Sequence, residues 1–140
     1  MSVIAPNFTL TNPSQTKKLS LESLKGKVVL LTFWTSWCPD SKRDLSEKHT
    51  LYQSMKNDDV AMVFIHVTGR DSSVDVEAWL DEMNLTFPVY SDVGTKTYDA
   101  YRCMGVPTTI LIDKKQQIVA TYNDQARFIL IVKGLGELLD

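Results

Sequence analysis

Residues 28–41 read VVLLTFWTSWCPDS, and this stretch decides which kind of fold the chain can adopt. Its first half, Val28–Trp34, is apolar apart from Thr32. A continuous apolar run of this length is typical of a central β-strand that is covered on both faces. The second half places Cys38 directly before Pro39, and proline is favoured in the first turn of a helix. The stretch therefore predicts a buried strand, a short loop and a helix that begins beside a cysteine.

Strands and helices alternate on either side of this stretch. The predicted strands cover residues 7–10, 17–19, 60–67, 87–90, 108–112 and 117–122, and the predicted helices cover residues 39–55, 76–83, 94–102 and 128–139. We expect Ser72 or Ser73 to cap the second helix. Strands joined by helical crossovers run parallel, whereas the last two strands form an antiparallel hairpin. The chain is thus expected to form one α/β domain over residues 1–140, with a central mixed sheet flanked by helices.

The composition argues against several classes of function. Fifteen Lys and Arg against seventeen Asp and Glu give a net charge of −2, which does not suit a nucleic-acid partner. No apolar run approaches the roughly 18 residues that a membrane-spanning helix needs. Two cysteines and two histidines supply neither a disulfide framework nor a four-ligand metal cluster, so we expect no metal and no cofactor. If Met1 is the native start, a cytoplasmic protein is expected, and an extracytoplasmic one if a leader or anchor preceded this sequence.

Cys38 is the residue best suited to chemistry. Its predicted place between a strand and a helix brings the sulfur near unpaired N–H groups and the positive end of the helix dipole, which stabilise a thiolate over a thiol. Lys42 and Arg43 in the first turns add positive potential, whereas Asp40 opposes it. Trp37 offers an apolar platform beside the sulfur. The alternative that position alone leaves open is a buried, inert cysteine at a strand end.

Two separated segments resemble the signatures of thioredoxin-like proteins. Residues 33–39, FWTSWCP, resemble the active-site segment, and residues 105–113, GVPTTILID, resemble the cis-proline loop and the strand that follows it. Residues 5–10 and 21–27 further resemble the start of the TlpA/ResA branch, also called the redoxin or AhpC/TSA-related group. The resemblance implies a thioredoxin-like fold with an N-terminal β-hairpin and a helix–strand insertion over residues 74–90. It also implies an oxidoreductase that catalyses thiol–disulfide exchange.

The resemblance gives each matching residue an expected role. Cys38 takes the place of the cysteine that attacks a disulfide, and Pro107 that of the cis-proline that abuts it. The backbone of Val106 would pair with the extended backbone of a partner, while Trp37 and Pro39 would flank the substrate beside the thiol. The expected partners are protein or low-molecular-weight disulfides and thiols, and the expected oligomeric state is a monomer.

Ser41 departs from the family pattern. The family motif is Cys-x-x-Cys, but here it reads Cys38-Pro39-Asp40-Ser41, so serine stands where the second, resolving cysteine is expected. A serine cannot attack a mixed disulfide and release the product, although its hydroxyl could hydrogen-bond the Cys38 thiolate. Three interpretations remain open. The first is a redox protein with one thiol that depends on an external reductant such as glutathione or a thioredoxin system. The second is a client-trapping or redox-inactive binding module, and the third is a serine introduced to capture a mixed disulfide.

Four other residues bear on the chemistry. Cys103, just before the cis-proline loop, is a candidate resolving thiol, but the matching family position usually holds a core aliphatic residue. Asp44 shares a helix face with Ser41 and matches an acid that tunes the protonation of the cysteines in the ResA-like branch, with a solvated helix residue as the alternative. Thr32 occupies the position of a buried acid of thioredoxins, so that proton acceptor is absent. His66 lies in a predicted buried strand, where a role in the core is expected.

A peroxiredoxin-like thiol peroxidase is the main enzymatic alternative, because the two folds are related. Peroxiredoxins use a Pro-x-x-x-Thr-x-x-Cys active site. Thr35 fits the threonine position, but Leu31 occupies the proline position. The tryptophans around Cys38 also fit the thioredoxin pattern better. The sequence therefore predicts a ResA-like thiol–disulfide oxidoreductase, with the binding module and the peroxidase as alternatives.

Overall fold

The computed structural model describes residues 3–139, and its centre is a mixed β-sheet. Over these residues the sheet has eight strands in the order β1-β8-β7-β4-β5-β6-β2-β3. The strands are β1 (Val3–Ile4), β2 (Thr9–Thr11), β3 (Lys18–Ser20), β4 (Val28–Trp34), β5 (Val60–His66), β6 (Val89–Ser91), β7 (Thr108–Ile112) and β8 (Gln117–Tyr122). The helices are α1 (Pro39–Ser54), α2 (Val76–Glu82), α3 (Lys96–Ala100) and α4 (Phe128–Leu139), with the 3₁₀ turns η1 (Glu22–Leu24) and η2 (Thr68–Arg70). None of these helices is both long and apolar enough to span a bilayer.

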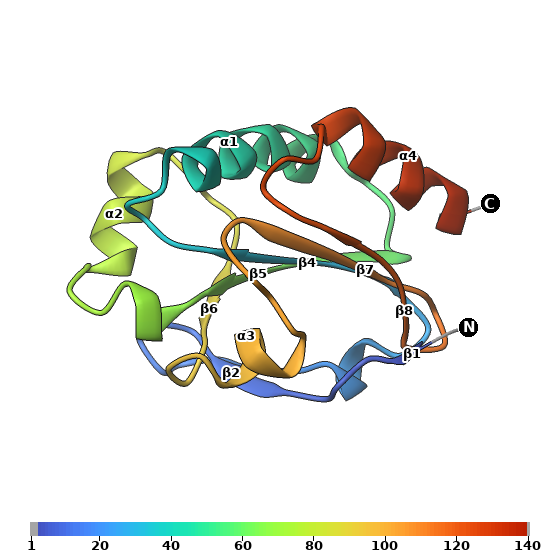
Figure 1. Cartoon of the computed structure of the whole chain (residues 1–140), viewed down its shortest axis with the longest axis horizontal. Helices are drawn as coiled ribbons and strands as arrows, with labels where there is room; N and C mark the ends of the chain where they lie inside the picture. The colour runs from blue at the N-terminus through green and yellow to red at the C-terminus, as the bar shows by residue number, and fades with distance from the viewer. Residues whose placement is uncertain (1–2, 140) are drawn as a thin grey trace.

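Helices cover both faces of the sheet. Figure 1 shows α1 and α4 over one face of the sheet and α3 against the other. Successive side chains of β4 point to opposite faces of the sheet, and each face has its own hydrophobic core. Val29 and Phe33 pack with Tyr98 of α3 on one face, whereas Val28 packs with Ile131 of α4 on the other. Every residue of β4 is buried. This double burial confirms the central strand predicted from its continuous apolar sequence.

Strand pairing brings three distant segments to one edge of the sheet. Strand β4 runs parallel to β5, with Trp34 opposite His66, and antiparallel to β7, with Phe33 opposite Thr108. The loop after β4, the loop after β5 and the loop before β7 therefore meet at the carboxyl end of β4. Helix α1 starts at the same edge, where open α/β sheets commonly place their functional sites.

The expected N-terminal hairpin and helix–strand insertion are both present, but some boundaries differ. Strands β2 and β3 pair antiparallel, and α2 with β6 forms the insertion. The strand predicted over 87–90 begins only at Val89, because Phe87 is buried by stacking on Phe64 at 3.7 Å rather than by strand pairing.

Helix caps account for two further corrections. Helix α2 is capped by Asp75, whose carboxylate accepts the Ala78 N–H at 3.1 Å, and not by Ser72 or Ser73. The helix predicted over 94–102 is confined to Lys96–Ala100. The carboxylate of Asp92 accepts N–H groups at the start of this helix, so its charge and hydrogen bonds fix where the helix begins.

Candidate active site

Cys38 lies at the N-terminus of α1, as the residue that precedes the first helical turn. Its backbone is extended (φ −87°, ψ 119°), and Pro39 occupies the first turn. The Cys38 carbonyl accepts the first intrahelical hydrogen bond, from Lys42 N–H at 3.1 Å. The side chain is 8% exposed. The N–H groups of the first turn have no carbonyl partner within the helix and favour a negative charge at this end, which suits a thiolate.

The loop before β7 lies directly against this thiol. The Val106–Pro107 peptide bond is cis, and the Cys38 thiol donates to the Val106 carbonyl with an S···O distance of 3.6 Å. Both Val106 and Pro107 are buried. The structure thus brings together Cys38, Pro107 and the Val106 backbone, the three groups that the sequence predicts to form the centre of the site.

Two exposed apolar side chains lie on the segments that carry Cys38 and Pro107. Trp37, next to Cys38, is 56% exposed, and Met104, three residues before Pro107, is 97% exposed. Pro39 is also exposed. The Trp37 indole is held in place because its Nε1–H donates to the Arg70 carbonyl at 2.9 Å. Trp37 and Pro39, the two sequence neighbours of Cys38, thus give the buried thiol an exposed, partly apolar rim.

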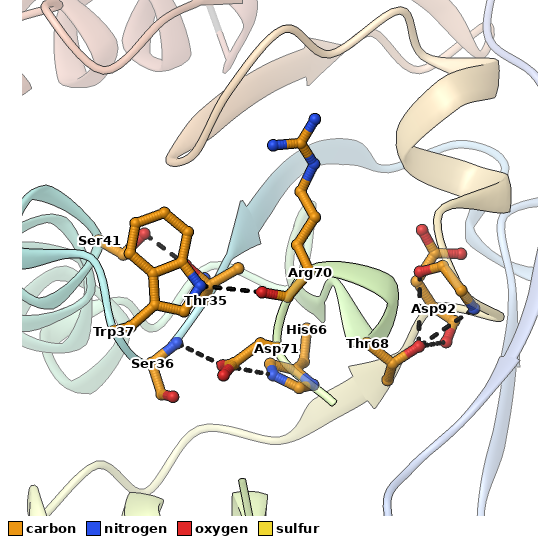
Figure 2. A network of polar contacts seen from close by, with 10 residues as sticks. Thr35, Ser36, Trp37, Ser41, His66, Thr68, Arg70, Asp71 and Asp92 are labelled. Atoms are coloured by element: carbon orange, nitrogen blue, oxygen red, sulfur yellow. Dashed lines mark hydrogen bonds and ion pairs between the residues drawn. The ribbon is translucent and has the colours of Figure 1, made fainter. Parts of the chain in front are cut away.

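The loop after β5 holds the loop that carries Cys38. The Asp71 carboxylate accepts the Ser36 N–H at 2.6 Å and the His66 Nε2–H at 2.9 Å (Figure 2). Burial opposes ionisation of Asp71, but the hydrogen bonds from Ser36 and His66 outweigh it and hold the pKa of Asp71 below its ordinary value. His66 is buried, as expected for a core residue, but its Nε2 also belongs to this network. Its Nδ1 is buried and has no hydrogen-bond partner within residues 3–139.

Gly69 allows this loop to pack closely on its neighbour. Its N–H donates to the Gly94 carbonyl at 2.9 Å. A Cβ at Gly69 would lie 2.8 Å from the carbonyl carbon of Gly94 and 2.8 Å from Thr95 Cγ2. The segment between β5 and α2 is therefore anchored on both sides, by Gly94 at one end and by the active-site loop at the other.

Sequence reasoning did not identify Arg70 or Asp71 as site residues. The signal that could have found them is topological. Polar residues that directly follow a buried parallel strand lie at the same sheet edge as those that follow its neighbour. Both residues come just after β5, which pairs with β4.

Ser41 has a different partner from the one expected. Its side chain is fully buried, and its hydroxyl accepts the Thr35 N–H at 3.5 Å (Figure 2). Among residues 3–139, the hydrogen bond of the Cys38 thiol is to Val106 rather than to this hydroxyl. The expected hydrogen bond from Ser41 to Cys38 is thus replaced by one to the strand–loop junction, because the backbone of Thr35 approaches the first turn of α1.

Asp44 is engaged by a buried lysine. Its carboxylate pairs with Lys48 Nζ at 2.8 Å, one helical turn away, and its side chain is only 13% exposed. The Lys48 ammonium also donates to Thr32 Oγ1 at 2.8 Å and Thr109 Oγ1 at 2.5 Å. Burial lowers the pKa of Lys48, and the attraction of Asp44 only partly offsets this effect. The acid is therefore neither solvated nor free to act alone on the thiol.

Sequence reasoning also missed Lys48, which is fully buried between α1 and the sheet. Lysines are seldom buried, and helical spacing alone gives no reason to place this one inside. Its two hydroxyl partners come from the paired strands β4 and β7, where Thr32 lies opposite Thr109. The position that is acidic in thioredoxins is here contacted by a cation.

Cys103 packs against the apolar core on the α3 side of the sheet, and both cysteines are free thiols. Burial raises the pKa of the Cys103 thiol to about 12. A thiol that stays protonated at neutral pH is a poor nucleophile, so the structure favours a packing role for Cys103. No cluster of potential metal ligands occurs within residues 3–139.

Comparisons with known proteins agree with this geometry. Residues 1–121 match the AhpC/TSA family. The thiol-disulfide oxidoreductase ResA of Bacillus cereus is 34% identical over 115 residues, which make up 82% of this chain and 65% of that protein. The exposed lipoprotein thioredoxin of Streptococcus pneumoniae superposes with a TM-score of 0.83 at 27% identity, covering 95% of this chain and all of the other. A thiol-disulfide isomerase from Corynebacterium glutamicum gives a TM-score of 0.80 at 27% identity over 97% of each chain. The thioredoxin-like fold expected from the sequence is confirmed.

Proposed function

The chain belongs to the AhpC/TSA family, and from this premise we propose that it is a thiol–disulfide oxidoreductase that acts through the single thiol of Cys38. One observation carries the proposal. The Cys38 thiol lies at the start of a 16-residue helix and against the carbonyl of Val106, while a buried serine hydroxyl stands one turn further along the helix. The names of the similar proteins support the same class of reaction. Because the chain spans only 65% of the first of these relatives, the activity remains a proposal.

The first step is attack on a disulfide. The Cys38 thiolate displaces one sulfur of the substrate, so that a new S–S bond forms to Cys38 and the other half of the substrate leaves as a thiolate. The Val106 backbone and the rim formed by Trp37 and Pro39 would hold an extended partner beside the sulfur. The N-terminus of α1 stabilises the anionic nucleophile before the step.

The second step needs a thiol from outside the chain. Ser41 cannot attack the mixed disulfide, and the partly buried Cys103, whose thiol pKa is raised to about 12, is poorly suited to replace it. An external thiolate displaces the bound substrate half and forms a mixed disulfide with Cys38. A second external thiolate then releases Cys38 and forms the oxidised dimer of the external thiol. Two external thiols are thus oxidised for each disulfide that is reduced, and glutathione is a suitable reductant.

Mass spectrometry of the intact protein tests this cycle. Protein treated with a small neutral disulfide is expected to carry one adduct at Cys38, which persists until glutathione is added. Cys103→Val should keep this behaviour, and Cys38→Ala should abolish it.

Other outcomes would contradict the proposal. An internal Cys38–Cys103 disulfide would indicate a two-thiol cycle. Client binding that survives Cys38→Ala would favour a binding module. Rapid formation of a sulfenic acid at low peroxide concentration would favour a peroxidase.

A further inference from the structure

We propose that Arg70 determines specificity at this site, with its guanidinium binding a carboxylate of the disulfide or thiol that reacts at Cys38. The substrate class is therefore an anionic disulfide or thiol that carries a carboxylate. This inference rests on the proposed function and adds a preference among its substrates.

The backbone of Arg70 is joined to the loop that leads into Cys38. Its carbonyl accepts the indole N–H of Trp37 at 2.9 Å, and Trp37 is the residue before Cys38. Asp71 strengthens the same junction through its hydrogen bond to Ser36. Figure 2 shows the Arg70 side chain extending from this carbonyl and away from the pair formed by His66 and Asp71.

The guanidinium itself has a defined position. It lies over the ring of Tyr98, 4.9 Å from the ring centroid, although Arg70 as a residue is exposed. Tyr98 belongs to α3 and is buried, so the aromatic surface under the cation is fixed. A cation that is already positioned loses less conformational entropy when it binds an anion.

The charge of Arg70 is available to a ligand. No acidic side chain within residues 3–139 forms an ion pair with it. Its acidic neighbour Asp71 is occupied by Ser36 and His66, and Asp40 at the start of α1 pairs with Arg43 at 3.0 Å. A guanidinium can bind a carboxylate through two parallel hydrogen bonds, which favours this ligand over a neutral group.

The test compares the rates at which Cys38 reacts with dithiodiglycolate, which is anionic, hydroxyethyl disulfide, which is neutral, and cystamine, which is cationic. Arg70→Gln keeps the carbonyl that holds Trp37 but removes the charge. We expect the ratio of the anionic to the neutral rate to fall about fivefold in Arg70→Gln at low salt, and to recover in part in Arg70→Lys. The preference should weaken as salt is added.

A matched control separates a local effect from a change in net charge. Lys115 is exposed and lies in the turn between β7 and β8, at the opposite end of β7 from Pro107. Lys115→Gln removes one positive charge and should leave the rate ratio unchanged. A second measurement uses iodoacetate and iodoacetamide, whose ratio of alkylation rates at Cys38 should fall in Arg70→Gln in the same direction.

The outcomes are distinguishable. If Cys38 reacts with the neutral disulfide but the rate ratios of Arg70→Gln and the unmodified protein agree, this inference is wrong and the proposed function stands. An equal loss with all three disulfides would assign Arg70 a structural role and also overturn the inference. If Cys38 reacts with none of the reagents, both the inference and the proposed function are wrong.

Discussion

The carboxylate of Asp71 accepts a hydrogen bond from the backbone N–H of Ser36 at 2.6 Å, across 35 residues of sequence. The contact joins the loop after β5 to the loop that leads into Cys38. Since the indole of Trp37 also donates to the Arg70 carbonyl, two consecutive residues of the active-site loop are tied to two consecutive residues of its neighbour. The position of Cys38, the proposed nucleophile, therefore depends on a segment that carries no sulfur.

Asp71→Ala is expected to loosen the active-site loop. The substitution leaves the Ser36 N–H and His66 Nε2 without their acceptor, so the free energy of unfolding should fall by about 1–3 kcal/mol. The pKa of Asp71 is lower in the folded protein than in the unfolded chain, where it is about 4. The ionised Asp71 therefore stabilises the folded state above about pH 4, and this stabilisation is lost as the pH falls through the lowered pKa. Urea unfolding from pH 7 down to pH 3 should show the two proteins converging. Asp58→Ala, at an exposed residue, is the control. If the free energies of unfolding of Asp71→Ala and the unmodified protein differ by the same amount at all pH values, the prediction is wrong.

Asp44→Asn should destabilise the protein because it leaves the buried Lys48 ammonium without its anion. We expect a loss of about 1–3 kcal/mol at pH 7, less than for a fully buried pair because Asp44 is partly exposed. The pKa of Lys48 is already below that of an unfolded lysine, and this change lowers it further, so folding releases a proton at alkaline pH. Stability of the variant should therefore rise with pH toward about 10, where an unfolded lysine titrates.

The double variant Asp44→Asn with Lys48→Met is the control for this pair. It removes both charges and should be more stable at pH 7 than Asp44→Asn alone. It should also lack the gain in stability at alkaline pH. If Asp44→Asn shows no dependence on pH beyond that of the double variant, Lys48 does not titrate as the structure indicates.

Cys103 should make the protein less stable above pH 9. Its thiol pKa rises from 9.0 to about 12 on folding, so the unfolded chain loses this proton first and stability falls as the pH passes 9. The contribution is at most about 1.4 kcal/mol per pH unit. Cys103→Val should reduce the decline between pH 9 and 10 in chemical unfolding experiments. Between pH 7 and 8 the difference between the two proteins should be constant, and parallel curves up to pH 10 would show that this thiol is not shielded.

Ser41→Cys should restore an internal release step. In a Cys103→Val background, a mixed disulfide at Cys38 should decay without external thiol, because the new thiol attacks it within the same molecule. The gain in release rate is expected to be on the order of 100-fold or more, since the attack becomes intramolecular. Intact-protein mass spectrometry follows the adduct over time. Ser41→Ala is the matched control and should retain it; equal lifetimes in the two variants would show that the position does not reach the bond.

The order of the strands and helices could be predicted because the apolar residues that form a strand or helix pattern in the sequence are, in most of the chain, the residues that are buried in the fold. The apolar run of β4 is buried on both faces, and Pro39 marks the start of α1, so the predicted limits of β4 and the predicted start of α1 are confirmed. The limits of β6 and α3 could not be predicted, because they depend on Phe64 stacking on Phe87 and on the carboxylate of Asp92. The first contact joins residues that are distant in sequence, and the second depends on where the turn before α3 places the Asp92 side chain.

The residues at the centre of the candidate site could be predicted from the sequence, whereas the residues that hold them in place could not. Cys38, Val106 and Pro107 belong to two recognisable segments, and the structure places them in contact. Lys48 and Asp71 lie outside those segments, and their partners come from neighbouring strands and loops. Spacing along one helix or strand carries no information about such partners, which become visible only once the sheet order is known.

The close packing at Gly69 has a consequence for how this protein can diversify. The backbone there meets Gly94 so tightly that any side chain would force the two loops apart, whereas the next residue, Arg70, is exposed and lies over the ring of Tyr98. One short turn thus joins a position that admits no side chain to a position whose side chain can change while the backbone stays anchored. A substitution at residue 70 alters the charge beside this loop but leaves the Gly69–Gly94 contact and the carbonyl that binds Trp37 in place.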